Sequence, residues 1–80
     1  MFRMRADAKT IHLDLRGVKC PLNWARAKVQ LERMDRGETL ELIVDDPRGA
    51  RDIPTAAEAE GYAVTDFSVQ GACWRLCIQR

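Results

Sequence analysis

One cysteine stands at a position where its thiol could act as a nucleophile. Cys20 follows a run of alternating apolar residues that Gly17 interrupts, and Pro21 comes directly after it. Proline suits the first position of a helix, because the N–H that it lacks would have no partner there. Cys20 is therefore predicted on the first turn of a helix, where free backbone N–H groups and the positive end of the helix dipole favour a thiolate.

The expected activation of this thiol is moderate. A helix N-terminus stabilises a nearby negative charge by about 0.3–1 kcal/mol. Arg16 and Lys19 would add to this if their side chains lie beside the sulfur, whereas nearby aspartates would oppose it. The alternative is that Cys20 is a small apolar residue at a strand–helix junction, since free cysteine is often buried.

The other residues that could do chemistry are scattered along the chain. It has three cysteines and one histidine. Cys73 and Cys77 fall on one predicted strand about 13 Å apart, too far for a disulfide or for a shared zinc ion. His12 falls on the polar face of another strand with no triad beside it. The sequence therefore predicts no metal and no cofactor, and it favours a structural role for Cys73 and Cys77.

The composition is that of one small globular domain. The 80 residues are 46% hydrophobic and 31% charged, with a net charge of +1. This balance gives no reason to expect nucleic acid or an anionic membrane as the partner. No apolar run approaches the roughly 18 residues of a membrane span, so we expect a cytoplasmic protein. Residues 1–10 are predicted to be a flexible lead-in and residues 11–80 the domain.

Hydrophobic periodicity predicts six elements. Strands are expected over residues 11–16, 39–45, 62–70 and 72–79, and helices over 21–35 and 47–60. Phe67 and Val69 are expected to face inward. Pro54 should kink or split the second helix. In the first helix, Leu22, Ala25 and Val29 form a second apolar line, which is either tolerated surface or a docking surface beside Cys20.

The order of these elements predicts an α+β fold. A strand, a helix and a second strand form a βαβ unit, so the first two strands should be parallel and end at the same edge of the sheet. Asp46 should then lie close to Cys20, and before Pro47 it is a good helix N-cap. Each strand has one apolar face and each helix one main stripe. This pattern is typical of a two-layer α/β sandwich, βαβαββ, with both helices on one face of a four-stranded mixed sheet.

Several short motifs in this order resemble the TusA/SirA family of sulfur-carrier proteins. The matching stretches are Leu13-Asp14-Leu15-Arg16-Gly17-Val18-Lys19-Cys20-Pro21, Gly37-Glu38, Asp45-Asp46-Pro47, Arg51-Asp52-Ile53-Pro54 and the region of Gly61. The resemblance covers residues 11–80. It implies a fold like the C-terminal domain of bacterial translation initiation factor three, in which the last strand inserts antiparallel between the second and third.

The resemblance also implies a function. The family cysteine that matches Cys20 accepts sulfane sulfur as a persulfide from a cysteine desulfurase or a rhodanese. It passes this sulfur to an acceptor, often a DsrE-type protein, for tRNA thiolation, molybdenum-cofactor assembly or sulfur oxidation. The chain would then be a sulfurtransferase-type carrier rather than a self-sufficient enzyme. Arg16, Lys19, Pro21, Leu22, Asn23 and Asp46 are the residues expected to bind the partner or to surround the thiolate.

One position departs from the family pattern. The helix start is usually Cys-Pro-x-Pro, and here the fourth residue is Asn23. Asparagine restores an N–H and is expected to place a polar side chain next to the sulfur. The departure is compatible with carrier chemistry and leaves open which partner and pathway the chain serves.

Three other functions stay open at this point. Cys20-Pro21-Leu22-Asn23 is similar to a glutaredoxin-type motif without its second cysteine, which would suit a monothiol redox module. A regulatory protein-interaction module would not need Cys20 at all. Nucleic-acid binding rests on fold analogy alone.

Overall fold

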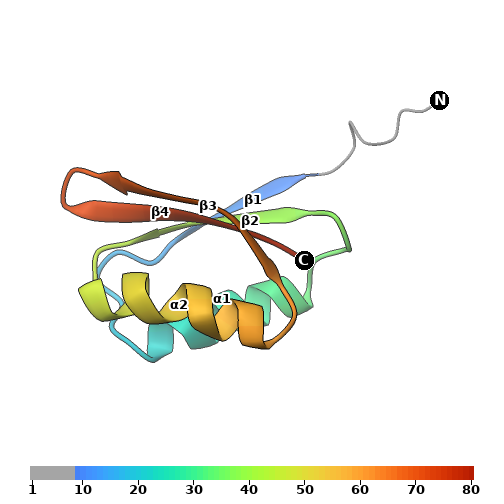
Figure 1. Cartoon of the computed structure of the whole chain (residues 1–80), viewed down its shortest axis with the longest axis horizontal. Helices are drawn as coiled ribbons and strands as arrows, with labels where there is room; N and C mark the ends of the chain where they lie inside the picture. The colour runs from blue at the N-terminus through green and yellow to red at the C-terminus, as the bar shows by residue number, and fades with distance from the viewer. Residues whose placement is uncertain (1–8) are drawn as a thin grey trace.

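The chain folds into two layers, with a sheet on one side and two helices on the other (Figure 1). The structure is a computed structural model and describes residues 9–80, so most of the lead-in predicted for residues 1–10 lies outside the described residues. The elements are β1 (Thr10–Asp14), α1 (Leu22–Glu32), β2 (Thr39–Val44), α2 (Pro47–Ala59), β3 (Ala63–Gln70) and β4 (Cys73–Gln79).

The sheet has the strand order β1-β2-β4-β3. β1 and β2 are parallel, because α1 carries the chain back across one face of the sheet before β2 begins. β4 lies between β2 and β3 and is antiparallel to both. The predicted α+β sandwich is confirmed, including the insertion of the last strand.

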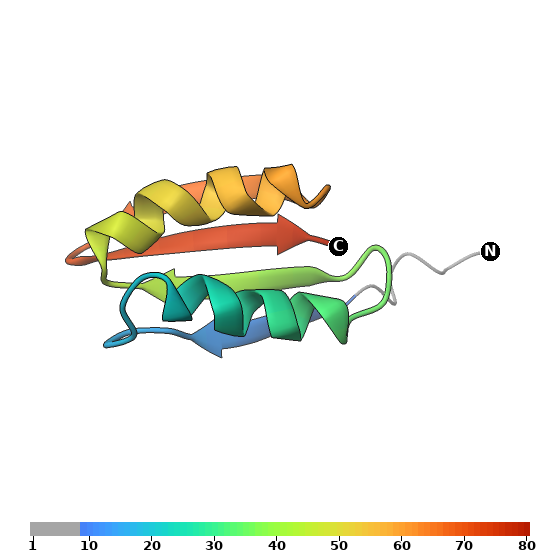
Figure 2. The ribbon, with the colours of Figure 1, turned by 90° about the horizontal axis from the view of Figure 1, so that it is seen from below.

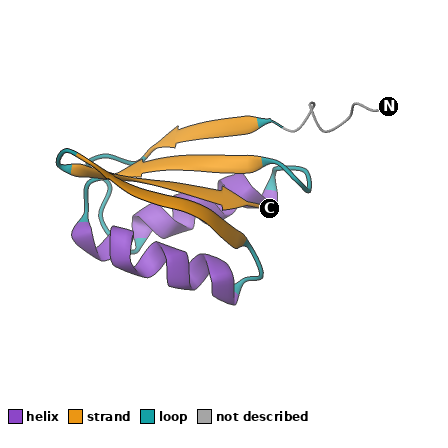
Figure 3. Cartoon of the chain, turned by 45° about the horizontal axis from the view of Figure 1, so that its top comes forward, coloured by secondary structure: helices purple, strands orange, loops and turns teal. Residues whose placement is uncertain are grey.

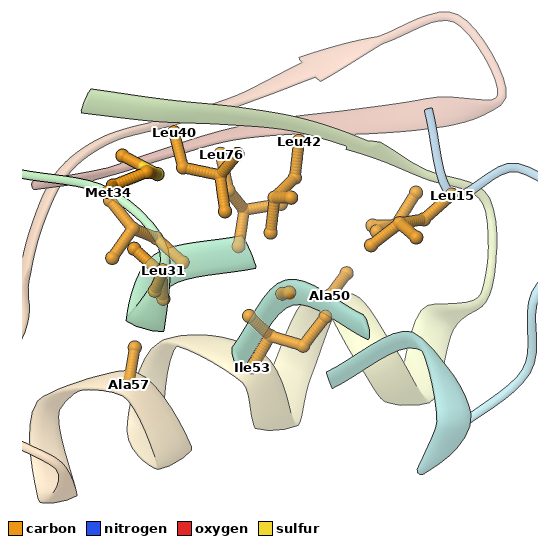
Figure 4. Packing of buried hydrophobic residues seen from close by; sticks show 12 residues of the cluster. Leu15, Leu31, Met34, Leu40, Leu42, Ala50, Ile53, Ala57 and Leu76 are labelled. Atoms are coloured by element: carbon orange, nitrogen blue, oxygen red, sulfur yellow. The ribbon is translucent and has the colours of Figure 1, made fainter. Parts of the chain in front are cut away.

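Both helices pack on the same face of the sheet, as the view from the helix side shows (Figure 2). The central strands β2 and β4 supply most of the sheet side of the core, since Leu40 is paired with Ile78 and Leu42 with Leu76, and all four are fully buried. The helices cover them with small and branched residues, namely Ala27, Leu31, Ala50, Ile53 and Ala57 (Figure 4). The small alanines let α1 and α2 approach the sheet closely.

Both helices differ in detail from the prediction. α1 ends at Glu32 instead of continuing to residue 35, because the N–H of Arg33 bonds to the Gln30 carbonyl and tightens the last turn. α2 runs without interruption through Pro54, so the predicted split is wrong. Proline removes one N–H, and the buried stripe that includes Ile53 on the same helix outweighs that loss.

Phe67 and Val69 face inward as predicted, but neither is buried in the core. Their partners across the sheet are Leu76 and Trp74, so both side chains lie on the face that carries the helices. Nevertheless, Phe67 is 46% and Val69 is 67% exposed. β3 is an edge strand, and the β3–β4 hairpin extends past the start of α2, which leaves its tip uncovered (Figure 1).

The other face of the sheet carries no helix (Figure 3). A row of hydrogen-bonded ionisable side chains crosses this face. Each strand contributes one residue to this row. Glu41 accepts hydrogen bonds from His12, at 2.5 Å, and from Arg75, which also donates to Asp66 at 2.5 Å. The hydrogen bond from Arg75 and, to a smaller extent, that from His12 hold the pKa of the Glu41 carboxyl below its usual value.

The Glu41 carboxylate should make stability depend on pH. Its folded-state pKa is lowered, so its contribution is present above the unfolded pKa of about 4.3 and is lost as pH falls through the folded value. Glu41→Gln should lower the free energy of unfolding by about 1 kcal/mol at pH 7 and flatten its decline towards pH 3. Urea unfolding at several pH values measures both. Glu58→Gln on exposed α2 surface is the control, and an unchanged pH slope in Glu41→Gln would contradict the assignment.

Candidate functional site

Cys20 lies in the turn that joins β1 to α1, two residues before the helix begins, and its side chain is partly exposed. Pro21 follows through a cis peptide bond. Pro21 occupies the N-cap position, with φ −95° and ψ 5°, and not the first helical position that we predicted. The helical dihedrals start one residue later, so Cys20 precedes the first turn of α1 instead of belonging to it.

The turn is held by two consecutive carboxylates from the loop after β2. Asp45 Oδ1 accepts a hydrogen bond from the Gly17 N–H at 2.9 Å, and Asp46 Oδ2 accepts one from the Cys20 N–H at 2.7 Å. The second oxygen of Asp46 accepts from the Arg48 N–H at 3.2 Å, which confirms the predicted N-cap of α2. One side chain thus caps a helix and fixes the main chain of the cysteine.

The Asp46 carboxylate is ionised although it is almost fully buried. It is only 7% exposed. The hydrogen bond from the Cys20 N–H is the largest cause that lowers the pKa of Asp46, followed by the Arg48 N–H and the charges of Lys19 and Arg48. The carboxylate therefore stays charged at neutral pH, and Lys19 and Arg48 offset its charge beside the turn.

Arg51 is a further charged residue near the Cys20 turn, for which the sequence patterns predicted no role there. Its guanidinium donates to both oxygens of Asp52, at 2.9 and 3.4 Å. That pairing is the main cause that raises the pKa of Arg51, and the sulfur of Cys20 contributes as well. Arg51 thus lies within electrostatic reach of the sulfur. Its position in the first turns of α2, soon after the cap, is the signal that could have indicated this.

Arg16 forms an ion pair with Asp14 at the end of β1. Its guanidinium donates to both oxygens of Asp14, at 2.9 and 2.7 Å, and lowers the pKa of that carboxyl to about 2. The pairing with Asp14 is the main cause that raises the pKa of Arg16, and the charges of Cys73 and Asp45 contribute as well. Asp14, two residues earlier in the chain, therefore pairs with the Arg16 guanidinium that we expected beside the thiolate.

The Asn23 side chain, which we expected next to the sulfur, is bonded to the main chain of the Cys20 turn and of α1. It is fully buried. Its amide nitrogen donates to the Val18 carbonyl at 3.4 Å, and its amide oxygen accepts from the Trp24 N–H at 2.7 Å. Asn23 lies on the inward face of α1, where α1 meets α2 near Gly49, so its amide satisfies main-chain groups.

The second apolar line of α1 borders a shallow groove. Leu22 is 54% and Val29 is 47% exposed. The groove encloses about 400 Å³ between α1 and the edge strand β1, and its lining residues are Leu13, Leu22, Ala25, Arg26, Val29, Gln30 and Arg33. Its lining includes Leu22, two residues after Cys20, and consists mainly of aliphatic side chains together with Arg26 and Arg33.

Two further kinds of site are absent from residues 9–80. No group of three or more His, Cys, Asp or Glu side chains comes together there to hold a metal ion. No helix of this part of the chain has the length and hydrophobicity needed to cross a membrane.

Comparison with protein families gives one match. The family model described as sulfurtransferase TusA matches residues 11–80. This range includes the Cys20 turn, both aspartates and all of the sheet except its first residue.

Individual proteins agree with this match. A protein of Archaeoglobus fulgidus described as a "putative sulfur carrier protein" is 35% identical over 95% of this chain and 92% of its own length. YedF of Escherichia coli K12, with the same description, is 32% identical over 85% of this chain and 88% of its own length. The solved structure of a SirA-like protein from Desulfitobacterium hafniense superposes with a TM-score of 0.74, at 25% identity, over 89% of this chain and 95% of that one.

Removing the Asp46 carboxylate should affect stability and the cysteine together. Asp46→Ala deletes the cap of α2 and the acceptor for the Cys20 N–H, so Tm should fall by about 5 °C. The loosened turn should also make Cys20 react faster with iodoacetamide. Calorimetry and mass spectrometry measure these effects. The deficit in Tm should shrink at acidic pH, because the wild-type carboxyl is then protonated and its lowered folded-state pKa has been passed.

Glu58→Ala is the matched control for Asp46→Ala. It removes an exposed carboxylate near the far end of α2. Equal alkylation rates in Asp46→Ala and Glu58→Ala would show that the carboxylate of Asp46 does not restrain Cys20.

Proposed function

Because the chain belongs to the TusA sulfurtransferase family, we propose that it is a sulfur carrier whose Cys20 accepts a sulfane sulfur as a persulfide and relays it to an acceptor protein. The observation that supports this most is that Cys20 is partly exposed while its main-chain N–H is held by the buried carboxylate of Asp46. Such a sulfur can be approached by a partner while its own position is defined.

The loading step is a thiol exchange on sulfane sulfur. The Cys20 sulfur attacks the outer sulfur of a donor persulfide, R–S–SH. A sulfur–sulfur bond forms on Cys20, the bond within the donor breaks, and the donor sulfur leaves as R–S⁻ and takes up the proton that Cys20 gave up. The sulfane sulfur keeps its oxidation state, so no oxidant or reductant is consumed.

Delivery of the sulfur to the acceptor is the same exchange, in which Cys20 is now the leaving group instead of the nucleophile. A nucleophile of the acceptor attacks the outer sulfur, and Cys20 leaves as the thiolate. The one histidine of the chain, His12, is engaged with Glu41 on the open face of the sheet and is not placed to act as a base for Cys20. A partner would therefore supply the remaining catalytic groups, as suits a carrier.

The partners belong to this proposal. The donor would be a cysteine desulfurase or a rhodanese and the acceptor a DsrE-type protein, in tRNA thiolation, cofactor assembly or sulfur oxidation within the cytoplasm. The groove beside Leu22 would receive part of the partner surface. Arg26 and Arg33 line it, and Lys19 and Arg48 flank the turn, so the partner should present acidic residues around an apolar contact.

Loading should require Cys20 and neither of the other cysteines. Burial raises the pKa of the Cys77 thiol and so disfavours its reactive form. After incubation with glutathione persulfide, the intact mass of wild type and of Cys73→Ser/Cys77→Ser should increase by one sulfur atom. Cys20→Ser should show no such increase.

Three results would refute the carrier function. Persistence of the mass increase in Cys20→Ser would place the sulfur elsewhere. A glutathione mixed disulfide on Cys20, in place of a persulfide, would favour the monothiol redox module. If Cys20→Ser also supported normal function in cells, a regulatory module would be the better assignment.

The groove should matter for a protein donor and not for a small one. Val29→Asp introduces a negative charge where we expect an acidic partner, so loading by a cysteine desulfurase with L-cysteine should slow by about tenfold. Loading by glutathione persulfide should be unaffected. Val69→Asp is the control, an equally simple change of an exposed valine on the opposite edge strand. Equal loading rates in the two variants would exclude the groove as the docking site.

A further inference from the structure

A buried amide lies behind the Cys20 turn, and the sulfur exchange described above does not use it. Asn23, the second residue of α1, has no exposed surface. In the part of the chain that the structure describes, Asn23 and Asp46 are the two buried polar side chains, and they lie at the starts of the two helices. Burying an amide is unfavourable unless its groups are paired, so its partners indicate what it holds.

Two of the partners of Asn23 are the residues immediately before Cys20. Its main-chain N–H donates to the Lys19 carbonyl at 3.1 Å, and its side-chain nitrogen donates to the Val18 carbonyl at 3.4 Å. The amide oxygen accepts from the Trp24 N–H at 2.7 Å. These partners also determine the orientation of the amide, because the reverse orientation would place oxygen against the Val18 carbonyl and nitrogen against an N–H.

The amide is kept in place from behind by Gly49 of α2. A Cβ atom at position 49 would lie 2.1 Å from Asn23 Nδ2 and 3.1 Å from Cγ, so only glycine leaves room for this side chain. Gly49 is not among the glycines with positive φ, and a side chain there would meet no backbone strain. The requirement for glycine is therefore the space that Asn23 occupies.

The main chain at Cys20 is thus restrained from both sides. Asn23 binds the carbonyls of Val18 and Lys19, and Asp46 binds the N–H of Cys20 itself. Both restraints come from the starts of helices that pack against each other. Neither of these polar groups needs to touch the sulfur in order to define where it points.

We infer that Asn23 is a positioning residue for Cys20, which acts by holding the Val18 carbonyl with an amide that Gly49 keeps in place. This inference rests on the proposed function, because it says how the sulfur is oriented towards a donor. A loosened turn exposes the sulfur to small reagents and presents it poorly to a protein that must meet it in one geometry. Loosening the turn should therefore speed the reaction of Cys20 with a small reagent and slow its reaction with a protein donor.

The test compares Asn23→Ala, Gly49→Ala and the double variant in a Cys73→Ser/Cys77→Ser background. Loss of the hydrogen bond or displacement of the amide should raise the rate of Cys20 alkylation by iodoacetamide about fivefold. Each single variant should also raise KM more than it lowers kcat for sulfur transfer from a rhodanese charged with thiosulfate. In the double variant the added methyl group at position 49 fills the space left by the amide. Tm should recover there, whereas the alkylation rate should stay high.

Two controls separate positioning from stability. Ala57→Gly destabilises α2 at its far end, where the wild-type alanine is fully buried, and should lower Tm without changing Cys20 alkylation. Asn23→Asp keeps the volume but directs an oxygen at the Val18 carbonyl, so it should also raise the alkylation rate of Cys20. It is the second variant, which decides the test if Asn23→Ala does not fold.

The inference is overturned if alkylation rates follow Tm across all variants, or if the double variant recovers both properties. Either result would make Asn23 a packing residue only. Failure of the wild-type protein to take sulfur from rhodanese or from glutathione persulfide would instead refute the proposed function. The alkylation series would still decide the role of Asn23 in that case.

Discussion

The structure around Cys20 depends on two neighbouring carboxylates that accept hydrogen bonds from the main chain of another loop. Asp45 binds the Gly17 N–H and Asp46 binds the Cys20 N–H, and the two loops meet because β1 and β2 are parallel and end at the same edge of the sheet. A carboxylate with N–H partners remains ionised, and its charge-assisted hydrogen bonds are stronger than neutral ones. The consequence is a cysteine whose main chain is fixed by the fold while its side chain stays partly exposed.

In this arrangement, the residues that stabilise the fold and the residues that a partner can reach lie in different parts of the protein. The core between the sheet and the helices is one apolar cluster, and Asn23 and Asp46 at the helix starts are the buried polar residues among residues 9–80. The cations near the turn remain largely on the surface, where a partner can reach them. The open sheet face has its own charged row through Glu41 and Arg75, and this row lies on the other side of the sheet from the helices. Stability and partner contact are therefore assigned to different parts of a small domain.

Sequence patterns predicted the fold well because the strands and helices alternate clearly and Asp46-Pro47 is a strong helix start. They also brought Asp46 to the Cys20 turn, since parallel pairing leaves little choice. They failed where tertiary packing decides the outcome. Phe67 and Val69 follow the pattern of core residues and face the helices, but both stay exposed on the edge strand β3. Asn23 reads as a surface polar residue, and only the approach of Gly49 from α2 shows why an amide is buried there.

The central claim is that Cys20 carries the transferred sulfur, and peptide mapping tests it most directly. Trypsin cleavage after lysine and arginine places the three cysteines on separate peptides, residues 20–26, 52–75 and 76–80. After incubation with a cysteine desulfurase and radiolabelled L-cysteine, the label should appear on peptide 20–26 and be released by a thiol. Label on peptide 52–75 or 76–80, or label that a thiol does not release, would contradict the account.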